Sequence, residues 1–407
     1  MRVTDALAID APQPVAGETF EHAGAIALIA VAGALQFSIA IAQILLLIAL
    51  VCWAVVLLVR HEGFEAPAFF WPLAAYAGAT LVSAAFSIDP RTSLIDCKQL
   101  VLFLIVPAAY RFLRGSRGHT VITVVLTCAA VSAAVGVAQY GILHYDQLVQ
   151  RPQGTLGHWM TYSGLLMLAI GLASARLLFG THDRTWALLV LPALTVAVAL
   201  TSTRGAWVGV CAAVALLFSL KDFRLFALLP VVAAVFFAVA PATITNRFVS
   251  IFDSKDPTKL DRFAMLHEGE RMIAAHPIEG VGPNMVERRY AEYRGPDAVN
   301  QTNPHLHNNP LQIAAERGLP ALVLWLWFIV AVVRDAWTRF RAGRHAVLAA
   351  TTLATVVALL VAGMFEYNFG DSEVLMLFLI LITLPAAADS QETPSHQSQV
   401  ARPQSRA

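Results

Sequence analysis

A succession of apolar stretches, most about 20 residues long, constrains the fold of this chain more than any other feature. Hydrophobic residues make up 57% of the 407 residues and charged residues only 14%, whereas a soluble chain carries about 25% charged residues. So few charges cannot cover a globular surface of this size, which excludes a soluble cytosolic enzyme and a disordered chain. The net charge of +1 leaves no basic excess for a nucleic-acid partner. We therefore predict an all-α, polytopic membrane protein.

The apolar stretches predict about 12 transmembrane helices. The first block, 23–59, is too long for one span, so we divide it near Gln36 and Gln43. The other expected spans are 69–87, 100–113, 119–142, 159–179, 185–202, 205–220, 224–242, 319–334, 345–364 and 372–388. The chain then consists of an N-terminal segment 1–22, transmembrane helices 1–9 over 23–242, a long connection 243–318, transmembrane helices 10–12 over 319–388, and a polar tail 389–407 that we expect to be disordered.

The distribution of Lys and Arg predicts the orientation. Alternate loops are basic, and their cations are Arg60, Arg111, Arg114, Arg117, Arg184, Lys221, Arg224, Arg334, Arg339, Arg341 and Arg344. We therefore place both chain ends in the cytoplasm and the connection 243–318 in the periplasm of a Gram-negative cell. Asp5, Asp10 and Glu18 precede the first apolar stretch, so we expect no cleaved secretory signal.

The clearest chemical motif lies late in the long connection, where Asn303-Pro-His-Leu-His-Asn-Asn-Pro310 precedes a short helical pattern. We predict Asn309 as the N-cap of this helix and Gly318 as its stop. His307 then lies just ahead of a helix N-terminus, which favours an anion. The imidazole is either a base for a hydroxyl nucleophile or a loop histidine that only caps the helix. His305 and His307 form an H-x-H pair, but no third and fourth ligand stands at a useful spacing, so we expect no metal.

Arg204 lies in a very short polar turn, Thr201-Ser-Thr-Arg204, between two apolar helices on the same face as the long connection. Its guanidinium fork matches phosphate oxygens. The alternative is an arginine that snorkels at a helix end. Snorkelling needs no Thr/Ser cluster, so we favour phosphate binding.

A further stretch that carries arginines runs from Asp261 to Pro277. Asp261 is the predicted N-cap of a helix that ends before Pro277 and carries Arg262 in its first turn. Arg271 follows later on this helix, and Arg288 lies beyond it. For Arg271 and Arg288, the alternative is a surface ion pair with a nearby glutamate.

Two outer loops give weaker signals. One begins at Arg151 and enters a span, and the other contains Glu366 and Asp371 between the last two spans. These acids could bind sugar hydroxyls or balance the arginines, or they could belong to a solvated turn.

Together these motifs resemble the O-antigen ligase family, within the broader group of O-antigen ligases and polymerases. His307, Asn308 and Gly318 fit the family motif H-[NSQ]-x9-G-x-x-[GTY], whereas Ala321 stands where Gly, Thr or Tyr is usual. The stretches around Arg151 and Arg204 and from Arg262 to Gly282 are similar to other recurrent patterns of the group. The resemblance covers roughly 90–375.

The resemblance implies a metal-independent, inverting glycosyltransferase of the GT-C type, without a cofactor, in the cell inner membrane. Its donor would be an undecaprenyl diphosphate-linked glycan and its acceptor lipid A–core, and both would meet at the periplasmic face among membrane lipids. Arg204 and Arg262 would bind the diphosphate, and His307 would orient or deprotonate the acceptor. The further substrate-binding candidates are Arg151, Arg271, Arg288, His305, Asn308, Asn309, Glu366 and Asp371.

Three other functions stay open. An O-antigen polymerase uses the same donor with a second lipid-linked glycan as acceptor, and a protein O-oligosaccharyltransferase is a further rival. A lipid-linked glycan flippase or transporter also has about a dozen spans, but it should carry charges or broken helices at mid-membrane. The expected spans contain almost no such charges, and the charged residues gather at one face instead.

Overall fold

The computed structural model describes residues 16–390 apart from 148, 182, 251–255 and 297, and these residues form helices joined by loops. The predicted all-α fold is confirmed. The first half contains α1 (Ala16–Ala34), α2 (Ile39–Arg60), α3 (Phe70–Phe86), α4 (Pro90–Asp96), the 3₁₀ helix η1 (Cys97–Leu104), α5 (Ile105–Phe112), α6 (Arg117–Gly141), α7 (Trp159–Phe179) and α8 (Arg184–Leu200). The second half contains α9 (Arg204–Lys221), η2 (Phe223–Leu228), α10 (Leu229–Val239), α11 (Ala242–Val249), α12 (Pro257–Ala275), α13 (Val286–Tyr293), α14 (Asn309–Arg341), α15 (Ala346–Ala362) and α16 (Ser372–Asp389).

Most helices follow the expected spans closely. The expected span 100–113 is only the end of a helical stretch that begins at Pro90, 224–242 is divided between η2 and α10, and 319–334 is part of the longer α14. Gln36 is buried in the turn between α1 and α2, which confirms the division of the first apolar block. By length and composition, seven of the described helices could cross a membrane, and four apolar helices are shorter. The count of about 12 spans therefore stays a prediction.

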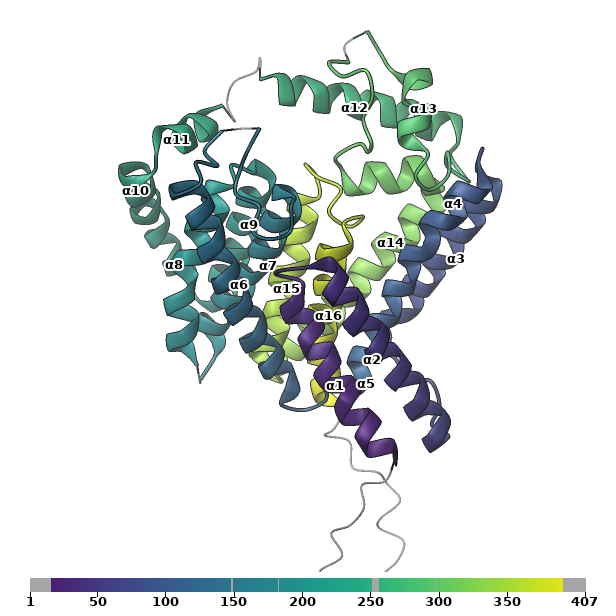
Figure 1. Cartoon of the computed structure of the whole chain (residues 1–407), viewed down its shortest axis with the longest axis vertical. Helices are drawn as coiled ribbons and strands as arrows, with labels where there is room; N and C mark the ends of the chain where they lie inside the picture. Colours follow the sequence, from purple (N-terminus) through teal and green to yellow (C-terminus); the bar gives the residue numbers. More distant parts are fainter. Residues whose placement is uncertain (1–15, 148, 182, 251–255, 297, 391–407) are drawn as a thin grey trace, which may run out of the picture.

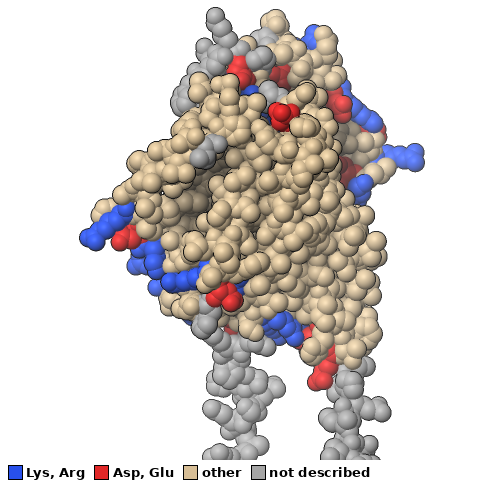
Figure 2. All heavy atoms as spheres, turned by 60° about the vertical axis from the view of Figure 1, so that its left-hand side comes forward, with Lys and Arg blue, Asp and Glu red and all other residues tan. Residues whose placement is uncertain are grey.

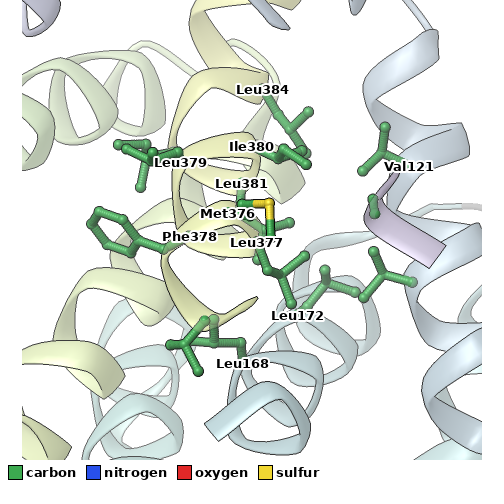
Figure 3. Packing of buried hydrophobic residues seen from close by; sticks show 14 of the residues in the cluster. Val121, Leu168, Leu172, Met376, Leu377, Phe378, Leu379, Ile380, Leu381 and Leu384 are labelled. Atoms are coloured by element: carbon green, nitrogen blue, oxygen red, sulfur yellow. The ribbon is translucent and has the colours of Figure 1, made fainter. Parts of the chain in front are cut away.

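The core of the bundle is built around α7 and α16, whose residues are buried along nearly their whole length. Leu168 and Leu172 of α7 lie close to Leu377 of α16, and Val121 of α6 approaches from the other side (Figure 3). Because lipid tails are as apolar as these side chains, close packing rather than exclusion of water holds such helices together. A rigid centre of this kind fixes the helix ends that carry the polar residues.

The long connection lies at the end of the bundle opposite to the start of α1 and the end of α16. The start of α1 and the end of α16 lie at the bottom of Figure 1, whereas α12 and α13 lie at the top. Charged side chains gather toward both ends of the face in Figure 2 and leave an uncharged belt between them. This arrangement agrees with the predicted topology, in which both chain ends share one side of a membrane and the connection lies on the other.

The long connection folds onto the start of α14 rather than forming an independent unit. The turn after α12 pairs with the end of the first α14 segment, where the N–H of Val281 donates to the Ala315 carbonyl over 2.9 Å. Gly318 then breaks α14 with φ 80° and ψ 167°. A Cβ atom at this glycine would lie 1.9 Å from the Ile278 carbonyl oxygen. The predicted helix stop at Gly318 is confirmed, and its cause is a close backbone crossing.

Two predicted N-caps are wrong. Asp256, not Asp261, caps α12, because Pro257 begins the helix and the N–H groups of the first turn reach the Asp256 carboxylate. Asp261 is instead an acceptor for the Asn300 side chain. Asn308, not Asn309, caps α14 by accepting from the N–H of Leu311.

The predicted terminal segments are only partly described. Residues 1–15 of the segment 1–22 lie outside the described part of the chain, and so do residues 391–407 of the tail 389–407. Helix α1 begins at Ala16, within the segment that we expected to precede the first helix. Asp389 is the last residue of α16, so the tail begins one residue later than expected.

Candidate active site

A cavity of about 130 Å³ lies where the outer ends of the bundle helices meet the long connection. Its walls carry four arginines: Arg151 before α7, Arg204 at the start of α9, Arg247 in α11 and Arg262 in α12. Glu366, from the loop between α15 and α16, completes the polar lining. The site is therefore assembled from segments spread over more than half of the chain.

The turn between α8 and α9 directs Arg204 into this cavity. Thr201 is buried, and its hydroxyl donates to the Val198 carbonyl over 2.7 Å. The Trp207 indole N–H donates to the same carbonyl over 3.0 Å. With the backbone held in this way, the Arg204 side chain is only 10% exposed. A snorkelling arginine would extend into water instead, so its placement favours a binding role.

Arg204 already has a carboxylate partner. Its two terminal nitrogens donate to both oxygens of Asp256 over 3.2 and 3.1 Å, and Arg247 approaches the same carboxylate to 3.6 Å. Burial by itself would raise the pKa of Asp256, but the hydrogen bonds and the charge of Arg204 lower it to about 2. Asp256 is therefore ionised at neutral pH.

The other two arginines are held near like charges. The Arg151 guanidinium lies 5.1 Å from the centre of the Trp159 ring. Burial and the charges of Arg247 and Arg204 lower the pKa of Arg151 to about 10. Burial also lowers the pKa of Arg262, although Glu366 opposes this effect. Cations brought together at a cost in desolvation and repulsion favour a polyanionic ligand.

A histidine–carboxylate cluster adjoins the arginines. His307 Nδ1 lies 3.0 Å from each Glu366 carboxylate oxygen, and His305 Nε2 lies 3.0 Å from one of them. Burial would raise the pKa of Glu366, but its bonds to both histidines hold it well below the usual range. When His307 donates its Nδ1 proton to Glu366, its Nε2 keeps a lone pair that can accept a proton.

The expectation that the H-x-H pair lacks a third ligand is wrong. Ligand atoms of His305, His307 and Glu366 lie within 4.8 Å of one another, and two imidazoles with one carboxylate suit a zinc ion. Sequence spacing could not show this, because Glu366 follows His307 by 59 residues. The charge of Arg262 near Glu366 opposes a cation at this position.

Three further candidates brace the site and do not line the cavity. Asn308 caps α14, and the buried Asn309 donates to Asn368 over 2.6 Å while accepting from the N–H of Phe369 over 3.1 Å. Asp371 caps α16 and accepts a hydrogen bond from Thr161. These bonds tie the start of α14 and the loop between α15 and α16 to the bundle.

Arg271 and Arg288 lie outside the cavity lining. Arg271 donates to the Tyr293 carbonyl over 2.9 Å. Arg288 is 54% exposed and pairs with Asp89 over 2.7 Å. The geometry thus places Arg204 and Arg262 together and leaves these two arginines apart.

Sequence analysis missed Arg247 and Asp256. No motif surrounds Arg247, so nothing local distinguishes it from other arginines of the connection. Asp256 did carry a local signal, because a proline directly after an aspartate is typical of an N-cap followed by the first helical residue.

Three of the four cavity arginines and the histidine motif lie within a segment that matches a known family. Residues 187–326 match the family model described as O-antigen ligase. Over this segment, about a third of the chain, the protein is similar to the O-antigen ligase family. The O-antigen ligase match contains Arg204, Arg247, Arg262 and His307, whereas Arg151 and Glu366 lie outside it. No curated protein matches the chain.

The family and the apolar helices together identify a multi-pass membrane protein with a function of the O-antigen ligase and polymerase type. The cavity holds fixed cations, and His307 adjoins it through its contact with Glu366.

Proposed function

We propose that this protein is an O-antigen ligase. It transfers a glycan from undecaprenyl diphosphate to a sugar hydroxyl of lipid A–core, at the periplasmic face of the inner membrane of a Gram-negative cell. The proposal rests on one observation above all, which is that Glu366 lines the arginine cavity and also contacts His307. A leaving-group site and a base therefore adjoin each other.

The arginines serve the donor. When the bond between the anomeric carbon and the phosphate oxygen breaks, negative charge develops on the departing lipid diphosphate. Arg204 and Arg262 stabilise that charge with fixed guanidinium groups, and Arg151 and Arg247 add to the field. No metal ion is needed for this step.

His307 serves the acceptor. Its Nε2 takes the proton of the sugar hydroxyl while the hydroxyl oxygen forms a bond to the anomeric carbon from the side opposite the phosphate. The configuration at the anomeric carbon is therefore inverted. Undecaprenyl diphosphate leaves, and Glu366 stabilises the imidazolium.

An O-antigen polymerase is the second candidate, because the same cavity would serve its donor. A transfer assay with purified protein, undecaprenyl diphosphate-linked glycan and lipid A–core separates the candidates on a gel. A ladder on lipid A–core, absent with His307→Ala and Arg204→Ala, is the expected result. Longer glycan on the lipid carrier would indicate a polymerase, glycan on a protein would indicate an oligosaccharyltransferase, and no transfer from intact donor would favour a transporter.

A further inference from the structure

The Asp256 carboxylate is surrounded by more hydrogen-bond donors and positive charge than its two oxygens and single charge require. Both terminal nitrogens of Arg204 donate to it, and Arg247 lies within 3.6 Å. The N–H groups of Thr258 and Lys259 at the start of α12 also donate to it, over 3.0 and 3.3 Å. Guanidinium forks and the N–H groups of a helix start are the groups that proteins use for phosphate.

This carboxylate engages two of the four cavity arginines. Arg204, Arg247 and Thr258 all line the cavity and contact Asp256, which is itself almost fully buried. A diphosphate in the cavity would meet guanidinium groups whose donors are already turned toward Asp256. It must therefore share those donors with the carboxylate or replace it.

Replacement is favoured by charge and by the number of acceptors. A carboxylate brings a single charge and two oxygens, while a diphosphate brings charge on each phosphate and more acceptor oxygens. The N–H groups at the start of α12 can bind a phosphate oxygen in place of the aspartate, because a helix start stabilises either anion.

We infer that Asp256 occupies the position of one donor phosphate, and that the phosphate replaces it when the donor binds. The inference rests on the proposed function, since it takes the cavity as the diphosphate site. In the absence of donor, Asp256 holds the Arg204 side chain in position and balances its charge. Donor affinity is consequently lower than the arginines alone would give, because the ligand has to break the pair between Arg204 and Asp256.

The opposite role for Asp256 makes the inference testable. If Asp256 stays in place and only positions Arg204, its loss weakens anion binding. If it competes with the ligand, its loss strengthens binding. Asp256→Asn separates these roles, because asparagine caps a helix as well as aspartate does but carries no charge.

Asp89→Asn is the matched control. Asp89 also caps a helix, α4, and also pairs with an arginine, Arg288, but that pair lies outside the cavity lining. Arg204→Ala is the second control, because it removes the arginine for which the two anions compete.

The experiment measures binding of inorganic diphosphate to the full-length protein in detergent by calorimetry. We expect Asp256→Asn to bind about tenfold more tightly than the wild type, since a buried charge pair no longer has to be broken. Asp89→Asn should bind like the wild type, and Arg204→Ala more weakly.

Two results would overturn the inference in different ways. Equal or weaker binding by Asp256→Asn, with normal binding by the wild type, refutes the competition and leaves the diphosphate site intact. An absence of binding in every folded variant refutes the diphosphate site and the competition together.

Discussion

His307 Nδ1 lies 3.0 Å from both carboxylate oxygens of Glu366, although 59 residues separate the two side chains. The contact joins the long connection to the loop between α15 and α16. It fixes the orientation of the imidazole and directs one ring nitrogen toward the carboxylate, so that Nε2 is left to act on a substrate. Loss of either partner should therefore affect transfer differently from loss of a group that only packs.

His307→Ala should lower kcat for glycan transfer by about 100-fold or more, because a positioned base contributes at least that much. Glu366→Gln should lower kcat less, since the imidazole is still present but no longer faces a carboxylate. The measurement is the initial rate of transfer at saturating donor. Wild-type kcat in His307→Ala would remove this residue from the catalytic set.

Arginines inside and outside the cavity should differ in their effect on transfer. Arg204→Ala and Arg262→Ala should each lower the rate by about 100-fold, as expected for loss of a fixed cation at a leaving group. Arg271→Ala and Arg288→Ala should stay within about twofold of wild type, because exposed pairs contribute little. A large loss in Arg288→Ala, with Arg262→Ala unaffected, would mean that the diphosphate binds elsewhere.

Acid should remove the stabilising effect of Asp256. Its pKa in the folded protein, about 2, lies below the ordinary 3.8. The carboxylate therefore stabilises the fold above about pH 4, by roughly 2 kcal/mol, and this contribution is lost as the pH falls toward 2. In detergent, the unfolding temperature of the wild type should be higher than that of Asp256→Asn at pH 6, and the difference should be smaller at pH 3. An equal difference at both values would contradict this account of the Asp256 pair.

Gly318→Ala should reduce folded protein severely. Its φ and ψ of 80° and 167° suit glycine almost alone, and a Cβ atom would lie 1.9 Å from a backbone oxygen. Gly343 is a matched control, because its φ is also positive, at 70°, but no atom lies within 4 Å of the position that an alanine Cβ would occupy there. Gly343→Ala should cost only about 1 kcal/mol. The readouts are the yield of monodisperse protein and the unfolding temperature, and equal behaviour of the two variants would contradict the close crossing at Gly318.

Chelation should leave transfer unchanged, because the proposed reaction relies on arginines for charge and on His307 for the proton. Added Zn²⁺ should inhibit by binding His305, His307 and Glu366, whose ligand atoms lie within 4.8 Å of one another. The test is the transfer rate with EDTA and then with Zn²⁺. Loss of activity with EDTA and its return with a divalent ion would make this cluster a metal site.

The helices were predictable because each apolar stretch carries its own evidence. Hydrophobic length sets a span, and a polar residue or a glycine sets its end, as at Gln36 and Gly318. The position of Arg204 was predictable for the same reason, since a short polar turn between two apolar helices must lie at the end of a bundle.

Pairings across the chain were not predictable in this way. Asn308 and Asn309 are equally good caps by residue type, and only tertiary partners decide between them, because Asn309 is taken up by Asn368 and Phe369. The contact of Glu366 with His307 depends on where the loop between α15 and α16 falls, which no local spacing encodes. These are contacts that the fold creates.

The four cavity arginines come from separate segments of the chain. Arg151 and Arg204 are carried by the edge of the bundle, whereas Arg247 and Arg262 are carried by the connection that folds over it. An excised fragment of the connection would keep only half of the charge and none of the geometry. Substrate recognition is therefore a property of the assembled chain. A mutation in the bundle and a mutation in the long connection would change the same electrostatic field.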